Sequence, residues 1–537
     1  MRKVIGVVVV IAGVLLAVAG GAVGVLFRSG DTVTTGSSTV PLDGAVALVS
    51  TAGVTAWTGG TLIVRASSST GPVFVGAGHP VDVRDFLGSR ARVEIVSVGA
   101  SGVGTHAVAG AGSPGALADP AAQTWWAAKA SGAGSQELRV RLDGTPVQFA
   151  VLPATPDKAS VTLTVAMWVA GARVAAVVSA VVGLLLVGLG WWVLRRGRRA
   201  SREVAGSRRR RGLGVGIGVA LLVPAVAGCG SVPRPTAAWD PATVAKQGLA
   251  STPLPAMLKD YDTRNNAAIL ATHTSGDPQA WGSADTGTLL DIDWFGTRYA
   301  AARGDSEPTV ISGTHEGSLA YSPEFTAYPM FVAVPLTERW SSGGSRDFVM
   351  VFTKKSSTAP WLGASTYVPR SQPLPAPATG AAATPTAADR ARVEKAAQDV
   401  LAGAEGKPST IASYGDLPQV HGWALKYAGE TAEVRTQVRF YRSSDVKDAV
   451  AKGAVRAVRM SDGSVLALVD LTLDHRITGK GGQGVAYDET RAKAFRRPDY
   501  YPEITLVVVC SVGVIIGADG STMMHGSSCS NVLPEGL

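Results

Sequence analysis

The chain has few cysteines, few charged residues and no collagen-like repeat. Three cysteines in 537 residues cannot build a disulfide-rich mini-scaffold, and the 64 glycines follow no Gly-X-Y period, which excludes a collagen triple helix. Charged residues make up 17% of the chain and hydrophobic residues 46%. This balance argues against a disordered chain and, with a mean hydropathy of +0.20, favours a membrane protein. The length allows about three or four domains.

The net charge of +9 is concentrated in one short segment. Residues 195–211 hold nine arginines and one glutamate, so the rest of the chain carries only about +1. A nucleic-acid-binding domain spreads its basic residues over a folded face or places aromatic residues among them. This segment contains no aromatic residue and directly follows an apolar stretch. We therefore expect a membrane-topology signal and no nucleic-acid partner.

Two uncharged segments are long enough to cross a membrane. They are Val4–Leu26, which follows Met1-Arg2-Lys3, and residues 174–194, which end near Trp191 and Trp192. Each has the about 20 apolar residues that a bilayer core requires. The first segment could instead be a cleaved signal peptide, but its apolar part is long for one and no Ala-x-Ala site follows. By the positive-inside rule, residues 195–211 are cytoplasmic and residues 28–165 lie outside.

A third apolar segment, residues 212–228, ends in Val226-Ala227-Gly228-Cys229. A basic stretch, a short apolar run and small residues before a cysteine resemble a bacterial lipoprotein signal. The segment predicts either lipidation of Cys229 or a short third transmembrane helix. In both cases residues 230–537 lie outside, so we expect a multi-pass protein of the cell membrane with large extracytoplasmic domains.

The sequence of the first outer domain, residues 28–165, predicts a β-sandwich. Short Val-rich runs separated by Gly, Pro and Ser are typical of such folds. The runs are residues 45–49, 61–66, 72–75, 91–98, 136–142 and 146–152.

Three stretches of this domain resemble a known family. They are PVFVG (residues 72–76), DVRDFL (82–87) and WWAAKASGAGSQEL (125–138). In order and spacing they are similar to an uncharacterised family of actinobacterial two-pass membrane proteins, over about residues 1–195. Family members often carry Asn-Ala-Asp-Gly after the last hairpin, where this chain has VLPATP (151–156). The resemblance implies a fold and a location and no reaction.

The second outer region predicts two α+β lobes divided by a Pro/Ala/Thr-rich spacer, residues 368–385. Helices are expected at residues 254–272, 286–301 and 386–401, and strands at 328–336, 347–353, 431–441, 465–473 and 503–516. The pattern is similar to folds with a helix packed on a curved sheet. It also resembles the C-terminal region of actinobacterial lipoproteins of unknown function.

The motifs typical of enzymes are incomplete. Asp285-Thr286-Gly287 matches the aspartic-protease triplet, but no second triplet exists, so a helix cap is the expected role. Ser444-Asp445-Val446-Lys447 matches S-x-x-K without its partner motifs. The seven histidines form no H-E-x-x-H and no zinc spacing. We predict no catalytic residue, no cofactor and no metal.

The last hairpin predicts a disulfide. Residues 503–516 are apolar and β-branched, and Asp519-Gly520 is typical of a two-residue turn. A hairpin centred on that dipeptide places Cys510 directly opposite Cys529, at a hydrogen-bonded, wider site of the ladder. An extracytoplasmic location permits oxidation.

The function predicted from the sequence is that of a non-catalytic, membrane-anchored and outward-facing module that binds or scaffolds. Its partners are the membrane and cell-wall or other envelope components. Two alternatives stay open: a carrier of lipid or a small apolar ligand in an α+β cavity, and a cell-wall hydrolase. The domain boundaries expected are 1–27, 28–165, 166–194, 195–211, 212–229, 230–367, 368–385 and 386–537.

Overall fold

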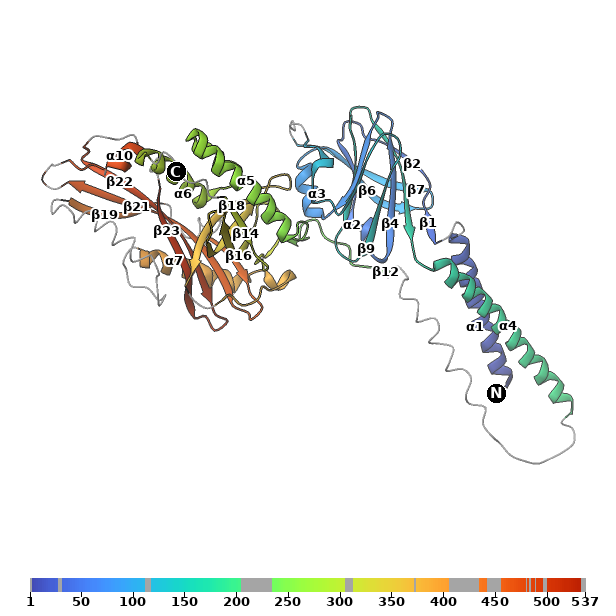
Figure 1. Ribbon diagram of the computed structural model, residues 1–537. Helices are drawn as coiled ribbons and strands as arrows, with labels where there is room; N and C mark the ends of the chain where they lie inside the picture. The colour runs from blue at the N-terminus through green and yellow to red at the C-terminus, as the bar shows by residue number, and fades with distance from the viewer. Residues whose placement is uncertain are drawn as a thin grey trace. The chain divides into compact units, whose positions relative to one another are not determined.

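The computed structural model (Figure 1) describes most of the chain as two compact units, Met1–Val244 and Ala245–Leu537. It leaves undescribed residues 1, 28–30, 112–116, 204–233, 305–311, 371–372, 405–433, 442–454, 480, 482–483, 488, 496–499 and 533–537.

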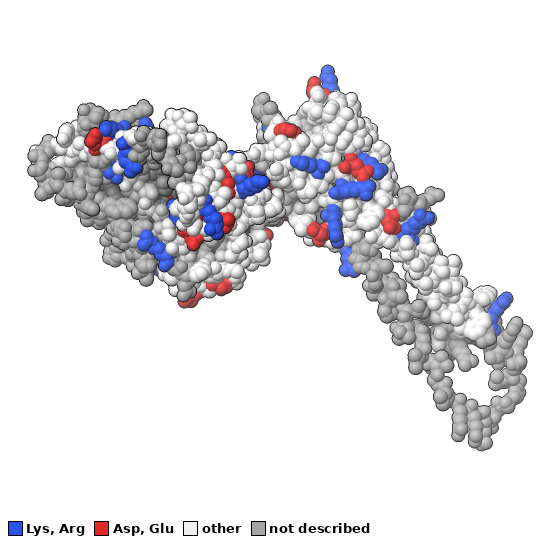
Figure 2. Space-filling model, viewed as in Figure 1, with Lys and Arg blue, Asp and Glu red and all other residues white. Residues whose placement is uncertain are grey.

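The first unit contains two paired apolar helices, α1 (Arg2–Leu26) before the sheets and α4 (Ala172–Glu203) after most of their strands. The two helices lie side by side in Figure 1. Both are long and apolar enough to cross a membrane. Figure 2 shows the helix pair white along most of its length, with charged residues towards its two ends. These two predicted segments are therefore helical over their whole apolar length.

Glycines bring the two helix backbones together. Gly6, Gly13 and Gly20 recur every seven residues on α1 and face α4. A methyl group on Gly13 would lie 2.7 Å from the carbonyl oxygen of Gly183, and one on Gly190 would lie 2.9 Å from that of Gly6. Small residues that let two helix backbones approach closely are typical of helix pairs in membranes.

The rest of the first unit consists of two six-stranded sheets. One contains β1 (Thr32–Thr34), β2 (Ser38–Pro41), β4 (Trp57–Ser68), β9 (Gln136–Asp143), β11 (Ser160–Trp168) and β12 (Arg234–Pro235). The other has the order β7 (Gly102–Val108), β6 (Arg92–Gly99), β3 (Ala47–Ser50), β10 (Gln148–Pro153), β5 (Val73–Gly78) and β8 (Ala128–Gly132). Among the short helices, α2 (Ala52–Thr55) connects the two sheets, whereas α3 (Pro80–Leu87) and η1 (Pro120–Ala122) lie between strands of the second sheet.

One apolar core lies between these sheets. Leu138, Val140 and Leu142 of β9 are buried while the residues between them are exposed, as the alternation in the sequence predicts. They pack in the same core as Phe149 and Val151 of the other sheet. The predicted sandwich is thus present as two sheets that share one core.

The stretches that carry the family resemblance meet in a second core. Phe74, Phe86, Trp125 and Trp126 pack together, and the two tryptophan rings are 4.0 Å apart. A methyl group on Gly76 would lie 2.7 Å from the Trp126 ring. These residues therefore share a structural role in packing.

The second unit is built on a nine-stranded antiparallel sheet of order β14-β16-β17-β18-β23-β22-β21-β19, with β20 also on β21. The strands are β14 (Gly313–Glu316), β16 (Met330–Trp340), β17 (Ser345–Lys354), β18 (Leu362–Pro369), β19 (Val434–Tyr441), β20 (Val455–Arg459), β21 (Val465–Gly479), β22 (Glu503–Ile516) and β23 (Thr522–Val532). Two short strands, β13 (Lys246–Gln247) and β15 (Glu324–Phe325), pair separately. The helices are α5 (Leu254–Ser275), η2 (Pro278–Ser283), α6 (Gly287–Arg303), η3 (Gly380–Ala383), α7 (Ala387–Ala404) and α10 (Glu489–Phe495).

Helices cover both faces of this sheet. Val508, Cys510 and Val512 of β22 pack against α7. Val507 and Val509 pack against α6. Because successive side chains of a strand point to opposite faces, α6 and α7 lie on opposite sides of the sheet.

The predicted division of this region into two lobes is wrong. β18, from the first expected lobe, pairs with β23, from the second, so one sheet runs through both. The expected spacer, residues 368–385, is part of the fold: Tyr321 Oη donates to Pro375 O (2.8 Å), and Ala383 is fully buried. A Pro-rich composition indicates an extended chain, but it does not show whether that chain packs against its own domain.

A second boundary also differs from the expected one. The expected lobe began at residue 230, whereas Arg234–Pro235 forms β12 on the sheet of the first unit, and this unit extends to Val244. Sequence composition does not reveal a two-residue strand of this kind.

Candidate functional site

Several residues singled out in the sequence lie outside the described part of the chain. Cys229 is one, and Ser444 and Lys447 of the S-x-x-K match are others. Within the described residues, no group of three or more His, Cys, Asp or Glu is placed to hold a metal ion.

The helix start expected at the Asp285-Thr286-Gly287 triplet is present, with the cap at the residue after Asp285. Thr286 is the N-cap residue of α6, and Asp285 is buried with 1% of its surface exposed. Its carboxylate accepts a hydrogen bond from Tyr261 Oη on α5 (3.0 Å). Thr286 N donates to Gly363 O (2.7 Å), which ties this turn to β18.

A second carboxyl group lies beside Asp285. Asp293, two turns into α6, is hydrogen-bonded to it. Burial raises the pKa of Asp285 to about 7. Burial, together with the adjacent Asp285, raises the pKa of Asp293 well above its usual value. Two carboxyl groups in contact cannot both ionise easily, so the pair holds a proton near neutral pH.

The groups around the pair join helices to strands. Arg264 of α5 donates to the carbonyl oxygens of Ser283 and Trp361, both at 2.6 Å. The ring of His315 on β14 pairs with Asp262 of α5 (2.6 Å) and lies 5.2 Å from the Tyr261 ring. These contacts stabilise the attachment of α5 and α6 to the sheet.

The surroundings of Asp285 are closely packed. A methyl group on Gly363 would lie 2.7 Å from Asp285 Oδ1 and 2.4 Å from Met350 Cε. Asp285 Oδ2 is also shielded from solvent. A shared proton in such a buried site affects the stability of the fold.

Sequence reasoning missed Asp293 because the protease pattern requires a second Asp-Thr-Gly. The available signal was different. Asp291 and Asp293 stand in an otherwise apolar helical stretch that includes Leu289 and Trp294. Carboxylates on such a helix require partners when they are buried.

The Cys510–Cys529 disulfide is present in the structure, with the two residues opposite each other on β22 and β23. The reasoning about the turn was partly wrong. Gly517 pairs with Ser521 around a three-residue turn instead of the expected two-residue turn. Near the turn, each residue of β22 is therefore opposite a β23 residue one position earlier than expected; Ile516, for example, is opposite Thr522. A bulge after Gly513, with His525 as the extra residue, restores the expected register at the cysteines.

The spacing of this pair also differs from the expectation. The two Cα atoms are 4.1 Å apart, which fits the narrow sites of an antiparallel ladder rather than the wider hydrogen-bonded ones.

Loss of this disulfide should lower the stability of the second unit. On the chain-entropy model, a loop of 19 residues is worth about 3 kcal/mol. We expect Cys510→Ala/Cys529→Ala and the reduced wild-type protein to melt at similarly lowered temperatures in scanning calorimetry. An unchanged melting temperature after full reduction would contradict the prediction.

An open groove lies on the second unit between β15, β16, α7 and β20. Its volume is about 450 Å³, and its lining includes Phe325, Pro329, Phe331, Arg390 and Arg456. The Phe325 and Phe331 rings are 5.4 Å apart, edge to face. We call it the Phe331 groove. An apolar floor with arginines at its rim suits an amphipathic or extended partner.

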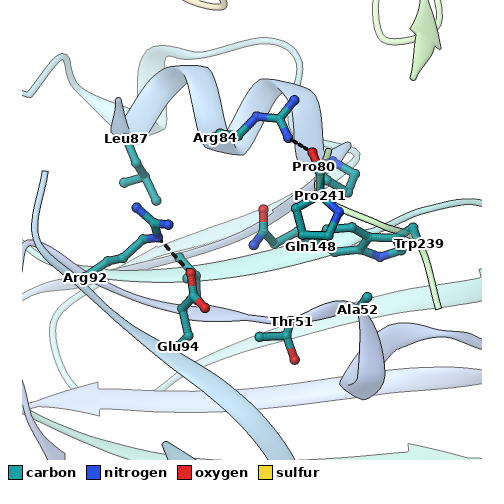
Figure 3. A pocket seen from close by; sticks show the side chains of 11 residues that line it. Thr51, Ala52, Pro80, Arg84, Leu87, Arg92, Glu94, Gln148, Trp239 and Pro241 are labelled. Atoms are coloured by element: carbon teal, nitrogen blue, oxygen red, sulfur yellow. Dashed lines mark hydrogen bonds and ion pairs between the residues drawn. The ribbon is translucent and has the colours of Figure 1, made fainter. Parts of the chain in front are cut away.

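A small pocket of about 80 Å³ lies on the first unit, close to α3 (Figure 3). Trp239 and Pro241, which follow β12, form part of its wall. Arg84 Nη1 donates to Pro241 O, and Arg92 pairs with Glu94 (3.0 Å) beside them. A wider apolar hollow of about 670 Å³ on the same unit includes Phe74.

A family model described as Domain of unknown function (DUF8094) matches residues 248–531. The match runs across residues 368–385 and covers nearly the whole second unit, in agreement with a single sheet there. No curated protein matches the chain.

Proposed function

The chain belongs to the DUF8094 family. We propose that it is a non-catalytic protein of the cell envelope, anchored in the cytoplasmic membrane by α1 and α4. The two-sheet part of its first unit and its second unit face outward to bind or scaffold envelope components. The glycine-packed helix pair carries this proposal. The apolar side chains of α1 and α4 that do not face the partner helix remain exposed, among them Val4, Ile5, Val8, Ile11, Leu15, Val18, Val177, Leu184, Leu185 and Trp191. Such a surface is unfavourable in water and suited to lipid.

We propose a finer identity from the sequence. The first half is of the actinobacterial two-pass type, and the second half resembles a lipoprotein attached through Cys229. Two acyl chains on that cysteine would give stable anchoring. The basic residues 195–211 remain in the cytoplasm.

A non-catalytic role is supported by the closed surroundings of Asp285, the carboxyl group nearest to a catalytic motif. On the face shown in Figure 2, acidic and basic residues alternate over both units. That distribution suits general solubility better than recognition of a polyanion such as nucleic acid.

The Phe331 groove is the proposed binding surface. Its aromatic floor supplies contact area, and Arg390 at its rim is exposed. Arg456 is paired with Asp470 (2.7 Å) and is therefore held in place. A partner with an apolar segment and a nearby acidic group fits this arrangement.

Photo-crosslinking in the native host tests this function. A photoreactive amino acid at Arg390 should form adducts with an envelope protein or cell-wall polymer, whereas one at Lys395, an exposed residue of α7 away from the groove lining, should not. Adducts with lipid at position 390 would support the carrier alternative instead. No adduct at position 390, with the protein present at its normal level, would contradict binding in the groove.

A further inference from the structure

The segment that follows residues 212–228 is bound to the first unit. Arg234 and Pro235 pair with Thr58 and Trp57 as an antiparallel strand at the start of β4, before the residues of β4, Thr61–Ser68, that pair with β11. Thr236 N then donates to Ala56 O (2.9 Å). We call residues 234–244 the strap.

The strap continues into the pocket of Figure 3. Trp239 lines this pocket, and its indole Nε1 is shielded from solvent. Arg84 of α3 donates to the carbonyl oxygen of Pro241, as the dashed line in Figure 3 marks. Asp240 closes a turn by accepting from Ala242 N (2.8 Å), and Val244 is 6% exposed. An added strand together with a half-buried tryptophan is a common way for one polypeptide to bind another.

The position of the strap constrains the path of the chain. α4 leaves the sandwich after β11 and, in the proposed topology, carries the chain into the cytoplasm. The strap lies on the same sheet as β11, so the chain must come back to the outer side before Arg234. The uncharged residues 212–228 are the stretch of sequence suited to that return crossing.

We propose that the strap is a docking segment that holds the C-terminal half of the protein on the first unit, and that it keeps the two halves together if the chain is cut before Cys229. The second part rests on the lipoprotein-like processing proposed above, whereas the docking itself does not. The partner of the surface formed by β4 and α3 is thus this chain's own residues 234–244. The second unit begins at the next residue, Ala245.

A cysteine pair tests the docking in the full-length protein in host membranes. Thr58→Cys and Arg234→Cys are direct partners across β4 and β12 and should form a disulfide in most molecules under mild oxidation. Digestion without reduction followed by mass spectrometry detects the linked peptides. If the chain is cut, the link joins two fragments that reduction separates.

The control pair is Thr39→Cys with Arg234→Cys. Thr39 is exposed on β2, which pairs with residues 160–163 of β11, at the far end of the same sheet from Trp57. This pair should not form a disulfide.

Adding Trp239→Ala to the Thr58/Arg234 cysteine pair should slow disulfide formation about tenfold, because an anchor of this kind carries much of the binding energy. Thr243→Ala, an exposed position of the strap, should leave the rate unchanged.

Absence of the Thr58–Arg234 link in protein that retains its Cys510–Cys529 disulfide would overturn the proposal, and so would equal bridging by the control pair. These results are separable from the proposed membrane topology. The two cysteines lie on one unit and would bridge even if the helices did not cross a membrane.

Discussion

Asp285→Asn should make the stability of the second unit less sensitive to pH between about pH 4 and pH 7, while the buried Asp293 keeps part of that sensitivity. The folded-state pKa of Asp285 is about 7, above the roughly 3.9 of an unfolded aspartate. A carboxyl group whose pKa is raised by folding makes its full contribution to the free energy of unfolding below the pKa that it has in the unfolded chain. It loses this contribution as the pH rises to the pKa that it has in the folded protein. At 1.36 kcal/mol per pKa unit, the loss amounts to about 4 kcal/mol, which asparagine avoids because it cannot ionise.

The groups that face the pair set the direction of this effect. Asp285 faces Tyr261 and Arg264 of α5 and His315 of β14. Asp293 faces Arg346 of β17 and Glu338 of β16. Arg264, His315 and Arg346 favour ionisation, but burial outweighs them. The net effect is a carboxyl pair that is most stable while protonated.

Calorimetric melting temperatures of the full-length wild-type and Asp285→Asn proteins, taken across this pH range, measure the effect. Asp260→Asn is the control, since its carboxylate is 59% exposed and it should follow the wild-type profile. If Asp285→Asn and wild type showed parallel pH profiles, the shared proton would be disproved.

Gly13→Leu should disrupt the helix pair. A side chain at this position would meet the backbone of α4, 2.7 Å from Gly183 O and Val187 N, and a backbone cannot move aside as a flexible side chain can. We expect a loss of at least about 3 kcal/mol, the upper end for overpacking. Gly183→Leu should act in the same way, since a methyl group there would lie 2.4 Å from Ala17 N.

Two glycines on the same helices provide matched controls. Gly21 and Gly188 have nothing within 4 Å of an added methyl group, so Gly21→Leu and Gly188→Leu should be tolerated. The amount of monodisperse protein extracted from membranes and its melting temperature in detergent compare the four variants. Similar behaviour of all four would show that the helices do not pack through Gly13 and Gly183.

Local patterns in the sequence predicted individual elements well. The apolar run from Glu503 to Ile516 became β22 with those bounds, and the expected helices correspond to α5, α6 and α7. Thr386 caps α7, since Asp389 N donates to its Oγ1 (3.2 Å). Periodicity and capping depend on neighbouring residues, which a sequence shows directly.

Contacts between distant residues were not predictable in the same way. The pairing of β18 with β23 joins residues more than 150 positions apart, and composition suggested a break between them. The strap pairs through two residues, Arg234 and Pro235, with no strand pattern of their own. The disulfide was predicted correctly because its hairpin is local. The unexpected turn shifts the strand pairing by one residue, and the bulge after Gly513 shifts it back before the cysteines.

The central claim is that the two-sheet part of the first unit and the whole second unit lie outside the membrane, with the arginine-rich segment inside. Cysteine labelling of intact spheroplasts tests it most directly. Ser37→Cys on the first unit and Ser275→Cys on the second are at exposed positions and should react with a membrane-impermeant maleimide beyond the level of the parent protein. Ser207→Cys should react only after the membrane is permeabilised. Labelling of position 207 in intact spheroplasts, or protection of position 275, would contradict the account.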